Sequence, residues 1–162
     1  IAIIIEAIAD NKNRALGEVK QALNQYGGKL VGEGAIRWMF DRKGVIIINS
    51  KLQITNPKTK EELELLAIEA GAEDLNWSRS QSDRGSSTES GQNNILEVYT
   101  KPEKLEETKK NLEAKNIKIE SSQISFIAKE EIEVAKKEQL ENLFEELDEN
   151  ETVQNIYSNL KN

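Results

Sequence analysis

The sequence predicts an α+β protein built from two small sandwiches, one inserted into the other. Short Ile- and Val-rich runs alternate with segments whose apolar residues recur at helical spacing. Residues 1–50 follow the order strand, helix, strand, strand, whereas residues 129–162 contain only a helix and a strand. Residues 51–128 follow the order helix, strand, strand, helix, strand. Mixed elements in this order are typical of the α+β class.

The expected domain organisation follows from the elements that residues 1–50 lack and residues 129–162 contain. A split β-α-β sandwich needs a closing helix and strand, and residues 129–162 can supply both to residues 1–50. We therefore expect an outer domain of 1–50 plus 129–162 and an inserted domain of 51–128. Both are expected to be ferredoxin-like sandwiches with antiparallel or mixed sheets. The polar, Ser-rich stretch 79–94 is predicted to be a mobile loop, because it holds too few apolar side chains to pack a core.

The outer domain is predicted to begin with a strand over Ala2–Ala9 and a helix capped by Asn11 or Asn13. Gly27-Gly28 ends this helix, because glycine adopts a left-handed conformation without a steric clash. Two strands, Ala35–Phe40 and Val45–Asn49, are predicted to form a hairpin. Its turn lies at Asp41–Gly44, with Gly44 at positive φ. A helix over Gln139–Leu147 and a strand over Thr152–Tyr157 close the domain.

The inserted domain is predicted from a second set of periodic segments. A helix over Glu61–Ala70 has Leu63, Leu66, Ala67 and Ala70 on one face, and Gly71 ends it. Pro102 opens a second helix, which directs Leu105, Thr108 and Leu112 inward. The predicted extended segments, in chain order, are Asp74–Ser78, Ile95–Thr100, Ile117–Glu120 and Gln123–Ala128.

The composition bears on which classes of function are plausible. The chain has neither His nor Cys, so it lacks the usual general base near neutral pH and the commonest zinc ligands. We therefore expect no enzyme, no catalytic residues, no metal, no cofactor and no small-molecule substrate. No apolar run approaches the roughly 20 residues that cross a bilayer, so we expect a cytoplasmic protein without a membrane partner. The chain begins inside an apolar run without Met, and further residues are expected upstream.

Charge is unevenly distributed along the chain, whose net charge is −7. Residues 1–50 contain seven Lys and Arg against five Asp and Glu, whereas residues 129–162 contain four against ten. The acidic runs Glu130–Glu133 and Glu145–Glu149 are interpreted as solvated faces rather than paired catalytic carboxylates. A protein with this balance is a poor nonspecific binder of nucleic acid as a whole. Any such contact is expected to be local and to use the basic corners of residues 1–50.

The first basic corner is the start of the first helix, where Lys12, Asn13 and Arg14 follow Asn11. Free backbone N–H groups and the helix dipole favour an anion at such a position. These side chains could therefore hold a phosphate group. The alternative is an ordinary capped helix terminus with solvated side chains, and the sequence slightly favours this alternative.

The second basic corner contains Arg37, Arg42 and Lys43 around Trp38. Trp38 could stack on a nucleic-acid base while the cations hold the backbone. The alternative is that Trp38 belongs to the core. Neighbouring side chains of a strand point to opposite faces, so a solvated Arg37 would place Trp38 inside, and this interpretation is favoured.

Several motifs in order along the chain resemble the YebC family. In the first part they are DNKNR (10–14), VKQAL (19–23), YGGKL (26–30) and IRWMFDRKGVI (36–46). Further along they are EAGAEDL (69–75), LEVYT (96–100) and VQNIYSN (153–159). The resemblance covers essentially the whole chain except the loop at 79–94. It implies a three-domain protein, of which this chain contains the second and third domains and lacks an N-terminal basic helical domain.

The resemblance also implies a function in gene expression. Family members are described as DNA-binding transcriptional regulators, and others resemble translation factors that act at the ribosome. The expected partner is therefore DNA or ribosomal RNA, contacted mainly through the N-terminal domain. Lys12, Asn13, Arg14, Arg37, Arg42 and Lys43 would then supply secondary contacts. The alternative is a ribosome-associated translational activator in which these two domains form a protein-interaction scaffold.

Overall fold

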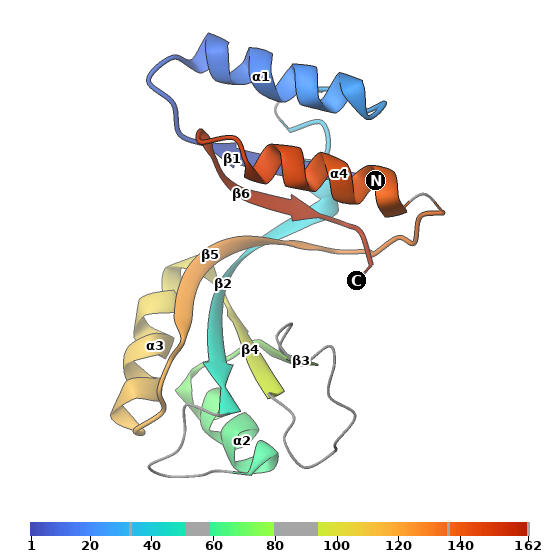
Figure 1. Ribbon diagram of the computed structural model, residues 1–162. Coiled ribbons are helices and arrows are strands. Elements are labelled where there is room, and N and C mark those ends of the chain that lie inside the picture. The colour runs from blue at the N-terminus through green and yellow to red at the C-terminus, as the bar shows by residue number, and fades with distance from the viewer. Residues whose placement is uncertain (33, 51–58, 80–93, 136, 162) are drawn as a thin grey trace. The chain divides into compact units, whose positions relative to one another are not determined.

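The computed structural model describes residues 1–32, 34–50, 59–79, 94–135 and 137–161, and it has the predicted α+β fold (Figure 1). Contacts between residues divide the chain into two compact units. Unit 1 comprises Ile1–Asp41 and Phe126–Asn162, and unit 2 comprises Arg42–Ser125. The predicted boundaries of independently folding domains, after residue 50 and after residue 128, stay a prediction.

Unit 1 is a two-layer structure in which helices cover one face of a small sheet (Figure 1). Strand β1 (Ile3–Ala7) pairs antiparallel with β6 (Val153–Ser158), with Ile3 opposite Ser158. Helices α1 (Lys12–Gln25) and α4 (Lys137–Asp148) pack on this sheet. The buried core residues of the two helices are Val19, Ala22, Leu23, Leu143 and Leu147, and Ile3, Ile5, Val153 and Ile156 of the sheet pack against them.

Unit 2 has the β-α-β-β-α-β order of a ferredoxin-like sandwich. Its strands are β2 (Phe40–Asn49), β3 (Asp74–Arg79), β4 (Asn94–Thr100) and β5 (Ser121–Ala128). They lie in the order β3-β4-β2-β5, and β4 runs antiparallel to both β2 and β3. The first residues of β2 and the last of β5 belong to unit 1.

Two helices pack against the unit 2 sheet. They are α2 (Lys60–Ala70) and α3 (Leu105–Ala114), the latter preceded by a 3₁₀ turn η5 (Pro102–Lys104). The buried core combines apolar residues of both helices with the sheet: Ile46, Ile48, Leu63, Ala67, Ala70, Leu96, Val98, Leu105, Leu112 and Ile117. The predicted inward faces of both helices are thereby confirmed. Gly71, at φ 114°, ends α2 as predicted.

The predicted hairpin turn at Asp41–Gly44 is wrong, because Phe40–Asn49 is one continuous strand. Gly44 lies opposite Thr100 of β4 and is not among the glycines at positive φ. A Cβ atom on Gly44 would lie 2.5 Å from Thr100 Oγ1 and 3.0 Å from Leu105 Cβ. Glycine is therefore required here for close packing rather than for a turn.

The predicted strand over Ala35–Phe40 is also wrong, because Arg37–Met39 forms a 3₁₀ helix, η1. Gly34, at φ 88°, turns the chain just before it. Residues 117–120 belong to no strand, although Ile117 is buried. The predicted mobile loop 79–94 lies outside the described residues except for its ends, Arg79 and Asn94, where β3 ends and β4 begins.

Candidate nucleic-acid interface

The start of α1 is a capped helix terminus. Asn11 Oδ1 accepts hydrogen bonds from the backbone N–H groups of Asn13 (3.1 Å) and Arg14 (3.2 Å). Two of the N–H groups that could have met an anion are therefore already satisfied. The side chains of Lys12 and Asn13 are exposed, and Lys12 forms no ion pair with a described residue. The first turn can thus offer an exposed lysine side chain to a phosphate, but not an open cluster of N–H donors.

Arg14 is exposed but already engaged with a neighbour on the same helix. Its Nε donates to Glu18 Oε1 at 2.8 Å, and Glu18 also accepts from Asn150 Nδ2 at 3.2 Å. The hydrogen bond to Glu18 raises the pKa of Arg14, and the hydrogen bonds from Arg14 and Asn150 lower the pKa of Glu18. A phosphate bound at Arg14 would therefore compete with an existing carboxylate.

Trp38 is exposed, which contradicts the favoured prediction that it belongs to the core. Its side chain is 70% exposed, and its indole N–H donates to the carbonyl oxygen of Ala35 at 3.1 Å. The prediction assumed a strand, in which the side chains of Arg37 and Trp38 would point to opposite faces. Trp38 instead lies in the 3₁₀ helix η1, which has three residues per turn, so that alternation does not apply. The alternative role of Trp38, stacking on a base, is therefore sterically open.

Arg37 is exposed, and its guanidinium group also contacts an aromatic ring. Its guanidinium group lies 5.6 Å from the ring centroid of Phe126, which meets the ring of Tyr157 edge-on at 5.4 Å. The hydroxyl of Tyr157 in turn donates to Glu6 Oε2 at 3.0 Å. This chain of contacts holds Arg37 against the β5 end of unit 1.

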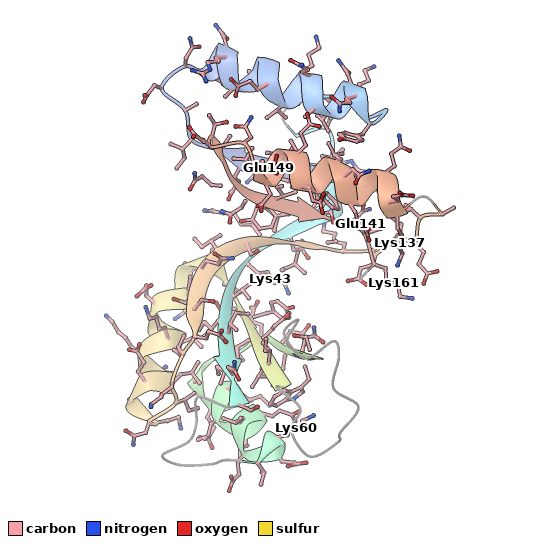
Figure 2. The ribbon with its side chains drawn as sticks, viewed as in Figure 1. Lys43, Lys60, Lys137, Glu141, Glu149 and Lys161 are labelled. Atoms are coloured by element: carbon pink, nitrogen blue, oxygen red, sulfur yellow. The ribbon has the colours of Figure 1, made fainter. Side chains whose placement is uncertain are left out.

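Arg42 and Lys43 are consecutive residues of β2 in unit 2, so their side chains point to opposite faces of the strand. Arg42 is exposed and Lys43 is half-buried. Lys43, labelled in Figure 2, has its Nζ 6.0 Å from the ring centroid of Tyr99 on β4. Sequence reasoning missed Tyr99, although the motif LEVYT places it in a strand that could have been paired with residues 43–49.

The candidate residues are thus divided between the two units. Lys12, Asn13, Arg14 and Arg37 belong to unit 1, whereas Arg42 and Lys43 belong to unit 2. Within unit 1, Lys12 and Arg37 line a common groove beside β1, and Arg14 is not part of that lining. In the two acidic runs, the predicted solvent exposure is found at Glu130, Glu131, Glu133, Glu145, Asp148 and Glu149, whereas Glu146 is half-buried.

Neither metal chemistry nor a membrane span is indicated in the described residues. No group of three or more Asp and Glu side chains in this part of the chain is arranged to hold a metal ion. No helix among the same residues combines the length and the apolar character that a membrane span needs.

Tyr99 leads to a pH-dependent prediction. Burial, followed by its hydrogen bond to the Glu97 carboxylate, raises the pKa of Tyr99 above its ordinary value of 10.0. Because the folded state holds the phenol proton more tightly, this stabilisation is complete below about pH 10 and is lost as the pH rises further. We expect the stability of the wild type to fall more steeply between about pH 9.5 and 11.5 than that of Tyr99→Phe. Guanidinium midpoints at each pH check this, and parallel curves would contradict it.

The fold and the candidate residues define an α+β chain with exposed cations and the exposed indole ring of Trp38. The chain belongs to the TACO1/YebC family: the model of its second and third domain matches residues 1–160. The family resemblance found in the motifs is thereby confirmed.

Curated relatives and a solved structure match along almost the whole chain. A probable transcriptional regulatory protein of Thermoanaerobacter pseudethanolicus is 33% identical over 162 residues, which are 99% of this chain and 58% of the relative. One of Caldanaerobacter subterraneus is 35% identical, over 99% of this chain and 59% of the relative. The crystal structure of a conserved hypothetical protein of Aquifex aeolicus superposes with a TM-score of 0.76 at 29% identity, covering 99% of this chain and 59% of that one. The chain therefore spans less than two thirds of each.

Proposed function

We propose that this protein is a nucleic-acid-associated regulator of gene expression. Its membership of the TACO1/YebC family carries the proposal, because relatives in this family are named probable transcriptional regulatory proteins. The exposed cations Lys12 and Arg42 and the exposed indole of Trp38 support it. Cations contact phosphates without reading sequence, and an indole stacks on any base.

In this proposal the two units make secondary contacts with the nucleic acid, and a separate part of the protein makes the main contact. The net charge of −7 opposes strong binding by this chain alone. The acidic face of α4 repels nucleic acid and so disfavours contact through that helix. The target is DNA in the transcriptional version of the proposal and ribosomal RNA in the translational version, in which the units also serve as a protein-interaction scaffold.

Charge reversal at the candidate residues tests the proposal. In the full-length protein, Lys12, Arg14, Arg42 and Lys43 are replaced by Glu, and binding to promoter DNA and co-sedimentation with ribosomes are measured. We expect affinity for the true target to fall about tenfold, or ~1.4 kcal/mol, with a shallower dependence on salt. The target that responds identifies the transcriptional or the translational version.

A control of equal charge separates local contact from overall repulsion. Four lysines on or beside α3, Lys101, Lys104, Lys109 and Lys110, are replaced by Glu in the same protein. This control should retain most of the affinity, because only long-range repulsion has changed. Equal losses in the two variants, or no loss in either, would remove these units from the nucleic-acid contact.

A further inference from the structure

A groove of about 1020 Å³ runs beside β1 in unit 1. Its lining comes from β1, α1 and the segment that follows α1, which includes Leu30 and Val31. Leu140 and Leu143 of α4 and Phe126 of β5 complete it. In the described part of the chain, β1 pairs with β6 alone. The second edge of β1 is therefore unpaired and faces a groove rather than another strand.

The backbone groups on this edge can be assigned from the hydrogen bonds at the end of β1. Asn159 donates its backbone N–H to the carbonyl oxygen of Ala2. Residues of an antiparallel strand alternate between facing and not facing the partner, so Ile4 directs its backbone groups to β6. Ile3 and Ile5 direct theirs to the open edge, where they form a template for one more strand.

The groove wall is mainly aliphatic and partly exposed. Leu16 on α1 is 42% exposed, and Leu30 and Val31 are 38% and 45% exposed. Leu16 lines the groove from α1 and is not among the buried residues of that helix. Several neighbouring apolar side chains left open in this way are typical of a binding surface.

The charged residues that line the groove indicate which net charge its ligand should carry. Among the described residues that line the groove, Lys12, Lys29 and Arg37 are cationic and Glu6 carries a carboxylate. Glu6 already accepts hydrogen bonds from Asn155 and Tyr157, whereas Lys12 and Lys29 form no ion pair with a described residue. A basic lining on a chain of net charge −7 favours an acidic occupant.

We propose that this groove binds an extended acidic peptide segment of a partner protein, added as a strand to the open edge of β1. Aliphatic residues of the peptide would contact Leu16, Leu30 and Val31, and its acidic residues would lie within reach of Lys12 and Lys29. A second copy of this chain is disfavoured because it would bring the same cations together, and a nucleic acid is disfavoured by the aliphatic wall.

The test uses a fluorescein-labelled nine-residue peptide in which Asp or Glu alternates with Val, titrated with the 162-residue chain by fluorescence anisotropy. We expect saturable binding that weakens with salt. The double variant Leu16→Glu/Leu30→Glu should bind about tenfold more weakly, as should a peptide N-methylated at alternate residues, because strand addition depends on main-chain hydrogen bonds. A peptide with Lys in place of its acidic residues should also bind about tenfold more weakly.

The matched control is Leu65→Glu/Ile68→Glu, which changes two apolar residues on α2 that are each 58% exposed. It should bind the peptide as the wild type does, and circular dichroism verifies the fold of both double variants. Equal losses in the two variants, or undiminished binding of the N-methylated peptide, would overturn the proposal. So would single-stranded RNA binding that Leu16→Glu/Leu30→Glu weakens as much as it weakens peptide binding, or a dimer in sedimentation velocity that the same variant abolishes.

Discussion

Alanine at Leu112 is expected to lower the free energy of unfolding of unit 2 by about 3 kcal/mol, the largest effect of any change considered. Leu112 on α3 is fully buried, among the core residues that α2, α3 and the sheet contribute. Truncation removes buried methyl groups and leaves a cavity that close-packed neighbours fill only in part. Guanidinium denaturation followed by hydrogen exchange of the α3 amides measures the loss.

A matched variant in unit 1 makes the same experiment a test of the predicted domain organisation. Leu147 on α4 is 1% exposed and belongs to the unit 1 core. If the units are independent domains, Leu147→Ala should lower the protection of α1 and α4 alone, and Leu112→Ala that of α2 and α3 alone. Equal loss of protection throughout the chain in both variants would show one cooperative unit and contradict the prediction.

Replacement of Gly44 by alanine is expected to destabilise unit 2 by about 2 kcal/mol through overpacking. The new Cβ would lie 2.5 Å from Thr100 Oγ1 and 3.0 Å from Leu105 Cβ. Thr100 is fully buried and Leu105 nearly so. Neither side chain can therefore move away from the new methyl group into solvent. The strand and the helix would have to move apart, which lowers the guanidinium midpoint.

Gly17→Ala is the control for this substitution, since Gly17 lies inside α1 and a Cβ atom there meets nothing within 4 Å. Alanine loses less backbone entropy on folding than glycine, so this variant should be more stable than the wild type by about 0.5–1 kcal/mol. A neutral Gly44→Ala variant would show that Thr100 and Leu105 are less confined than their burial indicates.

The helices could be predicted because their signals are local. Asn11 caps α1 and Gly27, at φ 76°, follows its end, as their residue types indicate. The apolar faces of α2 and α3 recur at the helical period and are buried as expected. Strands β1, β4 and β6 were likewise confirmed within a residue or two of their predicted bounds.

The region from residue 35 to 49 could not be predicted in the same way. Asp41–Gly44 has the composition of a turn, but pairing with β4 makes Gly44 part of one long strand. The position of Trp38 depended on a strand that is a 3₁₀ helix. The structure shows contacts in this region with distant residues. Thr100 and Leu105 lie around Gly44 and Phe126 lies against Arg37, all more than 50 residues away along the chain.

By itself, the sequence determined the α+β class, the helices with their caps and buried faces, the family, and the basic and acidic segments. These properties depend on residue type and short-range spacing. Only the tertiary structure decided that Gly44 is held by packing, that Trp38 is exposed and that Arg14 is paired with Glu18. It also decided that β1, among the described residues, pairs with β6 alone and lies beside a groove. These depend on which distant segments meet, and a periodic pattern along the chain does not specify its neighbours in space.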